Sequence, residues 1–98
     1  MKKVYFTLTG TCHYYGMDFL KKGDKIKLIK EPDNEYDKEA IRVEHKDGIG
    51  KIGYVANSTH TVLGETYSAG RIYDLFGKKA KARIEAILPQ GAICSLKL

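Results

Sequence analysis

The alternation of apolar and charged side chains is the feature that most constrains the fold of this chain. Residues 79–86 read Lys-Ala-Lys-Ala-Arg-Ile-Glu-Ala, so every second side chain is apolar and those between are charged. Because successive side chains of a strand point to opposite faces, this pattern predicts a strand with one buried face. Similar patterns predict five further strands, over residues 4–9, 25–31, 41–44, 51–55 and 92–98.

Tight turns separate most of the predicted strands. Lys46-Asp47-Gly48 is typical of a hairpin, and Pro89-Gln90-Gly91 turns the chain before its last strand. A small sheet of short strands avoids unpaired edges by closing on itself. The expected fold is therefore mainly β, a small six-stranded OB-like β-barrel with one or two short helices.

A few short segments are expected to depart from this strand pattern. Asn57 is a favourable N-cap, which predicts a helix over residues 57–64. Residues 72–76 carry apolar side chains at helical spacing, and residues 36–39 are predicted to form one helical turn. Gly53 lies inside a predicted strand, which indicates a bulge or a close approach by another backbone or a ligand.

Length and composition indicate a single soluble domain, residues 1–98. The chain is 43% hydrophobic and 30% charged, and it has no apolar run long enough to cross a membrane or to serve as a signal peptide. A cytoplasmic location without membrane contact is therefore expected. Two cysteines, Cys12 and Cys94, are expected to be reduced thiols. No cofactor is expected. No metal site is expected either, because zinc needs about four ligands and the sequence does not offer two ligand pairs at zinc-finger spacing.

The charge of the chain points to an anionic partner. Seventeen basic residues against twelve acidic ones give a formal net charge of +5. Such an excess suits nucleic acid, although charge alone does not identify the partner.

The connection between the second and third predicted strands holds the most promising binding residues. Pro32 restricts the backbone, and Asp33 and Asn34 are residue types that start tight turns. Asn34, Tyr36 and Asp37 are therefore expected to project from a constrained loop, where binding residues often lie.

These residues belong to a longer pattern that resembles the HIRAN domain family. The pattern comprises Glu31-Pro32, Asn34-x-Tyr36-Asp37, Ala40-Ile41-x-Val43 and Ile52-Gly53-Tyr54-Val55, with Gly10 and His13-Tyr14-Tyr15-Gly16 upstream. The resemblance implies a small β-barrel related to the OB-fold. It also implies binding to the 3′ end of single-stranded DNA, as in the DNA-repair members of that family.

The resemblance also assigns roles to individual residues. Tyr14 or Tyr15, together with Tyr36, would hold the terminal bases, and Asp37 would accept a hydrogen bond from the terminal 3′ hydroxyl. A carboxylate repels phosphate, so Asp37 would also disfavour a strand that continues or ends in phosphate. The alternatives are that the tyrosines fill the core, that Asp37 caps the turn before residue 40, and that Asn34 merely sets the turn.

Further residues are candidates for nucleic-acid contacts. Tyr54 offers another ring, and Arg42, Lys51 and backbone N–H groups near Asn57 offer donors to phosphates. Repair members tend to carry arginine where His13 stands and often have proline where Glu35 stands. Histidine is mostly neutral at pH 7, and glutamate adds negative charge to the loop, so both departures weaken the attraction for a phosphate.

Catalysis is not expected. His13 with Asp37 is the candidate acid–base pair, and the chain contains no phosphate-binding glycine loop or nucleophile elbow. The preferred hypothesis is binding of single-stranded DNA at a 3′ hydroxyl end. A nuclease or helicase encoded elsewhere is a candidate partner that the sequence does not identify. A protein-interaction module of the same fold and a binder of RNA ends are the alternatives.

Overall fold

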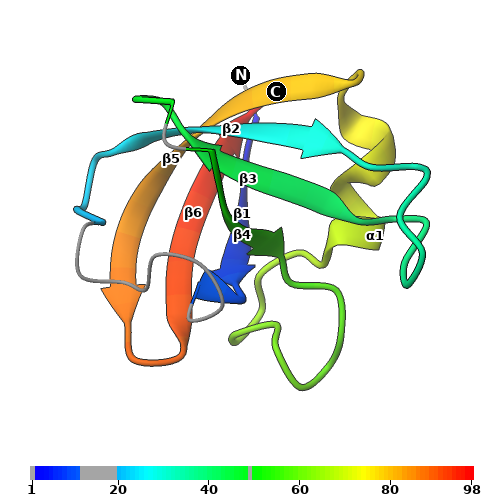
Figure 1. Ribbon diagram of the computed structural model, residues 1–98. Coiled ribbons are helices and arrows are strands. Elements are labelled where there is room, and N and C mark those ends of the chain that lie inside the picture. Colours follow the sequence, from blue (N-terminus) through cyan, green and yellow to red (C-terminus); the bar gives the residue numbers. More distant parts are fainter. Residues whose placement is uncertain (1, 12–19, 49) are drawn as a thin grey trace.

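Six antiparallel strands close into a barrel in the computed structural model, which describes residues 2–11, 20–48 and 50–98 (Figure 1). The strands are β1 (Lys3–Thr9), β2 (Lys25–Lys30), β3 (Ile41–His45), β4 (Lys51–Val55), β5 (Lys79–Leu88) and β6 (Gly91–Lys97). Their order around the barrel is β1-β4-β3-β2-β5-β6, and pairing of β6 with β1 closes it. The predicted mainly β, six-stranded architecture is confirmed.

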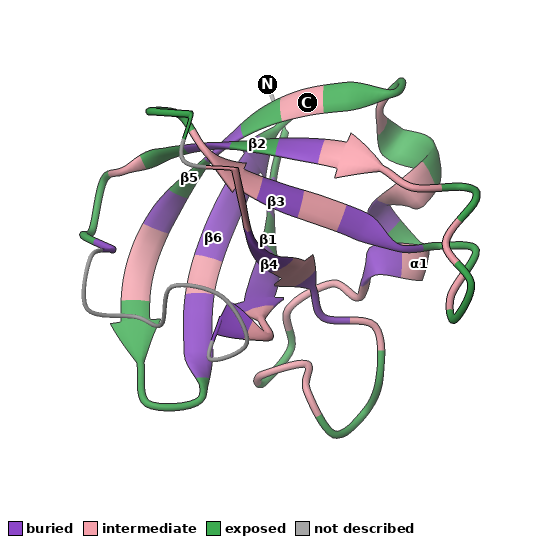
Figure 2. Ribbon diagram, viewed as in Figure 1, coloured by how far each residue is buried: buried purple, intermediate pink, exposed green. Residues whose placement is uncertain are grey.

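The core lies inside the barrel and is built from the apolar positions of the alternating strands (Figure 2). Phe6 and Leu8 of β1, Leu28 of β2 and Ile84 of β5 are completely buried. The charged residues between them point outward, as the period-two pattern predicts. Burial of these side chains provides the main driving force for folding.

A bulge in β5 ends the regular alternation of that strand. Ile84 pairs with Cys94, but Ala86 pairs with Ile93, so Glu85 is an extra residue in β5. Beyond the bulge the strand bends away from the core, and Ile87 is 39% exposed.

The predicted helix over residues 57–64 is wrong. The structure has a single hydrogen-bonded turn there, in which the N–H groups of Thr61 and Val62 bond to the carbonyl oxygen of Ser58. β-Branched residues disfavour a helix, and Gly64 has a positive φ of 58°. The side chain of Asn57 makes contacts elsewhere in the fold.

Helical structure occurs later in the chain, close to the predicted residues 72–76. The short helix α1 (Ala69–Ile72) is followed by a 3₁₀ turn, η2 (Tyr73–Leu75). Ala69 and Ile72 are buried against the core, which holds α1 on the barrel. Figure 1 shows α1 at the same end of the barrel as the loop between β2 and β3.

Gly53 illustrates how closely the barrel strands pack. It pairs with Val43, and a Cβ atom added to it would lie 2.5 Å from the carbonyl oxygen of Thr9 and 2.8 Å from Cδ1 of Leu8. The close backbone approach predicted at this glycine is therefore observed.

We predict that Gly53→Ala destabilises the protein by about 1–3 kcal/mol, because the new methyl group displaces backbone that cannot yield freely. Gly77→Ala is the matched control, since Gly77 has open space around its Cα and no positive φ. Urea denaturation of the two variants measures the difference. Equal stabilities would contradict a steric role for Gly53.

Candidate nucleic-acid interface

The loop between β2 and β3 is shaped by the side chain of Asn34. Its Oδ1 accepts hydrogen bonds from the backbone N–H groups of Tyr36 (2.9 Å) and Asp37 (3.0 Å). These bonds fold residues 34–37 into an Asx-type turn, so the helical turn predicted over residues 36–39 is wrong. The turn-setting role considered for Asn34 is what the structure shows.

Glu31 anchors this loop to the barrel. Its carboxylate accepts hydrogen bonds from Nδ2 of Asn34 (3.0 Å), Oη of Tyr54 (2.9 Å) and Nη1 of Arg42 (3.1 Å). The donors come from the loop, from β4 and from β3, so one carboxylate joins three segments. Glu31 lies at the end of β2, directly before the turn at Pro32.

The surroundings of Glu31 favour its ionised form. Burial raises the pKa of the Glu31 carboxyl, but the hydrogen bonds from Asn34 and Tyr54 and the charges of Lys51 and Arg42 outweigh burial. The pKa therefore lies below its usual value, which means that the charged carboxylate stabilises the fold.

Arg42, Lys51 and Tyr54, all candidates for nucleic-acid contacts, belong to the same network. Arg42 lies between Glu31 and Glu44, with its Nε 2.9 Å from Oε2 of Glu44 in an ion pair without hydrogen-bond alignment. Nζ of Lys51 donates to Oη of Tyr54 (2.8 Å) and lies over the tyrosine ring. Burial is the main reason that the pKa of Tyr54 is raised. A phosphate at these positions would have to compete with contacts that already exist.

Asp37 and Asn57 form a second group of contacts beside the first. Oδ1 of Asp37 accepts a hydrogen bond from the N–H of Glu39 (2.8 Å), and the N–H of Ala40 bonds to the Asp37 carbonyl oxygen (3.1 Å). Asp37 thus caps the turn before Ala40, as one alternative anticipated. Oδ2 of Asp37 accepts from Nδ2 of Asn57 (2.9 Å).

Asn57 connects this loop to α1. Its Nδ2 also lies 3.3 Å from Oε1 of Glu39, and its Oδ1 accepts a hydrogen bond from the N–H of Gly70 (2.8 Å). Asn57 therefore satisfies an N–H group in the first turn of α1, and not of the helix predicted to follow it. The phosphate-binding helix start expected at Asn57 is absent from this described segment, because no helix forms there.

Tyr36 differs from the other tyrosines that the structure describes. The residue is 93% exposed, although its backbone N–H is held by Asn34. The alternative that Tyr36 fills the core is wrong. An aromatic ring held in solvent on a constrained backbone can stack on another ring without rearrangement of the loop.

Three predicted site residues, His13, Tyr14 and Tyr15, lie outside the residues that the structure describes, so their predicted roles stay predictions. The catalytic pairing of His13 with Asp37 is equally untested.

Two residues important to this region were missed in the sequence. Glu31 was noted only as part of the Glu31-Pro32 pattern and Glu39 only as the end of a predicted helical turn, yet they bond to Asn34 and Asn57 respectively. An acid directly before proline at the end of a strand was the available signal for Glu31.

Some other expectations concern sites away from this loop. Cys94 is buried, and burial raises its pKa to about 12. Within residues 2–11, 20–48 and 50–98, no group of three or more His, Cys, Asp or Glu side chains is arranged to hold a metal ion. In the same ranges, no helix has the length and apolar character to cross a membrane.

We predict that Glu31→Gln reduces stability at neutral pH and flattens its dependence on acid. The contribution of ionised Glu31 is present above its usual pKa of 4.5 and is lost as the pH falls through the lowered pKa of the folded state. The unfolding free energy of the variant should therefore fall less below pH 4.5 than that of the wild type. Part of the fall remains, because the pKa of Asp24 is lowered by His45 and that of Glu85 by Ser95.

Urea denaturation at a series of pH values measures this effect. Glu35→Gln is the control, because Glu35 is exposed on the same loop. An acid dependence in Glu31→Gln as steep as that of the control would contradict the anchoring role of the carboxylate.

Comparison with known proteins identifies the family. The structure resembles the crystal structure of the HIRAN domain of human HLTF with a TM-score of 0.68 and 17% sequence identity, covering 96% of this chain and 72% of that chain. Among curated proteins, none matches the sequence significantly. The HIRAN domain family model matches residues 1–86. Since that match spans most of the sequence, this chain belongs to the HIRAN domain family.

Proposed function

We propose that this protein binds single-stranded DNA at a free 3′ hydroxyl end, using the loop between β2 and β3. Membership of the HIRAN family suggests DNA binding by a non-catalytic module. The observation that carries the finer proposal is the 93% exposure of Tyr36, which directly precedes Asp37 on a backbone held by Asn34.

The tyrosine provides a stacking surface for a base. Stacking of a base on an aromatic side chain contributes about 1–3 kcal/mol in single-strand binding proteins. Because the Tyr36 backbone is already ordered, little conformational entropy is lost when a base binds. Tyr14 or Tyr15 is proposed to supply a second ring, as the family resemblance implies.

Asp37 is suited to accept a hydrogen bond from the terminal hydroxyl. Its two carboxylate oxygens are oriented by the N–H of Glu39 and by Asn57, and each oxygen has a further lone pair available. A hydrogen bond between a hydroxyl and a carboxylate is of the stronger, charge-assisted kind.

The charge of the loop also favours a strand end that lacks phosphate. Five of the twelve acidic residues of the chain lie within residues 31–39, against one basic residue there, Lys38. A terminal phosphate would bring additional negative charge beside these carboxylates, which is unfavourable. The acidic loop therefore selects a hydroxyl end by excluding the phosphorylated one.

We predict that an oligonucleotide with a 3′ hydroxyl binds about tenfold more tightly than the same oligonucleotide with a 3′ phosphate, a difference of about 1.4 kcal/mol. Asp37→Ala should reduce this ratio towards one. Glu35→Ala removes the same charge from an exposed position of the same loop and should largely keep the ratio. Fluorescence anisotropy measures the affinities, and thermal melting checks that each variant is folded.

Equal affinity of the wild type for the two ends would remove the proposed end recognition. Equal effects of the two substitutions would assign the selectivity to loop charge and not to Asp37. Competition by an RNA oligonucleotide with the same sequence tests whether the end must be DNA.

A separate prediction concerns Tyr36. Tyr36→Ala should weaken binding by about 5- to 150-fold, which corresponds to the loss of one stacked base. Tyr36→Phe should bind almost as the wild type does, because stacking needs the ring and not the hydroxyl. Neither change should alter thermal stability appreciably, given the exposure of the ring. Unchanged affinity of Tyr36→Ala would exclude the ring from the binding site.

A further inference from the structure

The outer surface of the barrel carries an unusual array of like charges. Across β2 and β5, Lys25 lies opposite Arg83 and Lys27 lies opposite Lys81. Directly opposed like charges destabilise a sheet, whereas mixed charges in these positions would stabilise it. The array therefore has a cost for folding, which indicates a role other than stability.

The array continues across the next two strands. Lys97 of β6 lies opposite Lys3 of β1, and both are exposed. We call this surface the basic face and define it by its six cationic residues, Lys3, Lys25, Lys27, Lys81, Arg83 and Lys97. Of these, only Lys3 has an ion pair with another described residue.

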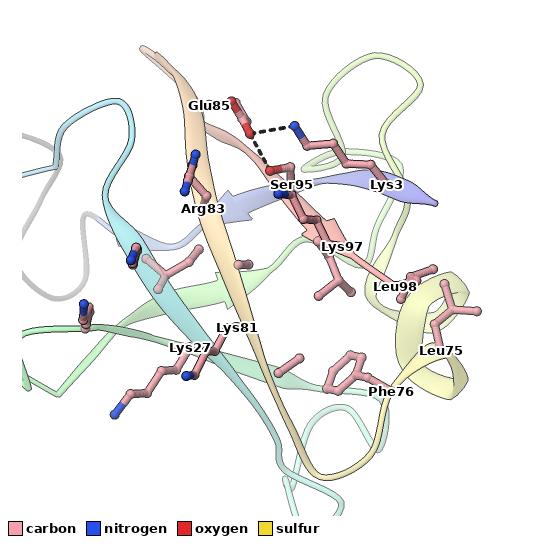
Figure 3. A pocket seen from close by; sticks show the side chains of 16 residues that line it. Lys3, Lys27, Leu75, Phe76, Lys81, Arg83, Glu85, Ser95, Lys97 and Leu98 are labelled. Carbon is pink, nitrogen blue, oxygen red and sulfur yellow. Dashed lines mark hydrogen bonds and ion pairs between the residues drawn. The ribbon is translucent and has the colours of Figure 1, made fainter. Parts of the chain in front are cut away.

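The basic face lines an open groove of about 930 Å³ (Figure 3). Lys46 adds another cation, and Leu75 and Phe76 lie at one end of the groove. Glu85 is the one acidic residue among those described that line it. Its carboxylate is already engaged, because it accepts a hydrogen bond from Ser95 and pairs with Lys3 at 3.4 Å.

The geometry of the face suits a regularly repeating anion. Neighbouring strands are about 4.8 Å apart, and side chains on one face of a strand repeat every ~6.7 Å. Cations thus recur along β2 and β5, and one cation on each of β6 and β1 extends the array across the sheet. A phosphodiester backbone presents one negative charge for each nucleotide, so it can engage several of these cations at once.

The remainder of the molecule explains why such a surface is needed. The loop proposed to hold the strand end is strongly acidic, and Arg42 beside it is already paired with Glu31 and Glu44. That loop cannot provide the electrostatic attraction on which nucleic-acid affinity largely depends. The excess positive charge of the chain is available instead on the basic face.

We propose that the basic face binds the phosphodiester backbone of DNA at positions away from the strand end. This inference rests on the proposed DNA binding but not on recognition of a 3′ hydroxyl. The loop would then provide selectivity for the end, and the basic face would provide affinity that is independent of sequence.

Circular single-stranded DNA provides the test, because it has a backbone and no end. We expect the wild type to bind it with an affinity that falls as salt increases. The triple variant Lys27→Gln, Lys81→Gln and Arg83→Gln should reduce the slope of log K against log salt by about 2, the value for three lost phosphate contacts on a single strand. It should fold normally, since it removes opposed like charges.

The matched control is the triple variant Lys2→Gln, Lys21→Gln and Lys22→Gln, which removes the same charge from exposed positions outside both the groove and the candidate binding loop. It should nearly retain the wild-type slope. Equal losses in the two triple variants would overturn the proposal, because net charge alone would then explain binding. Failure of the wild type to bind circular DNA would overturn it too, as would binding to anionic lipid vesicles in place of DNA.

The same measurements separate this proposal from end recognition. If the basic-face variant loses affinity for linear DNA but keeps the preference for a 3′ hydroxyl over a 3′ phosphate, both proposals are supported. If the wild type binds circular DNA through the basic face but shows no preference between ends, only end recognition fails.

Discussion

The candidate binding loop depends on the hydrogen bonds that the carboxylate of Glu31 accepts. This carboxylate is only partly exposed, and it accepts hydrogen bonds from Asn34, Tyr54 and Arg42, which lie on three different segments. A buried carboxylate without such donors would be costly, whereas with them its ionised form is favoured. This contact holds Asn34 in place, and Asn34 in turn holds the backbone of Tyr36 and Asp37. The backbone of Tyr36 is thus held in place by hydrogen bonds while the residue itself stays exposed to solvent.

A second consequence is the separation of charge over the molecule. Acidic residues are concentrated in the loop, where they bond to amides and cap turns, and cations are concentrated on the outer faces of β2, β5, β6 and β1. A strand end without phosphate suits the first region, and a phosphodiester chain suits the second. Net charge alone would have suggested a uniformly attractive surface. Under the two proposals, affinity and end selectivity would reside in different parts of a small barrel.

Several sequence-based predictions were limited by the range over which their rules apply. The alternation in residues 79–86 correctly indicated a strand, but the bulge at Glu85 comes from the pairing with β6. Asn57 was predicted to cap a helix directly after it, and that helix does not form. Its side chain instead accepts a hydrogen bond from the N–H of Gly70 in α1, whose N-cap is Ser68, and donates one to Asp37. Rules for caps consider only the next few residues, and tertiary contacts between distant segments can override them.

Period-two alternation and turn residues determined the strands, the turns and the mainly β class, because they depend on the geometry of an extended chain and on local backbone preferences. The motif around Asn34, Tyr36 and Asp37 was equally visible in the sequence. Only the tertiary structure decided that Glu31 joins three segments, that Asn57 ties the loop to α1, and that Lys27 lies opposite Lys81. The physical reason is that hydrogen bonds and charge pairs act over a few ångströms in space. Which residues come that close is set by closure of the barrel and not by their separation along the chain.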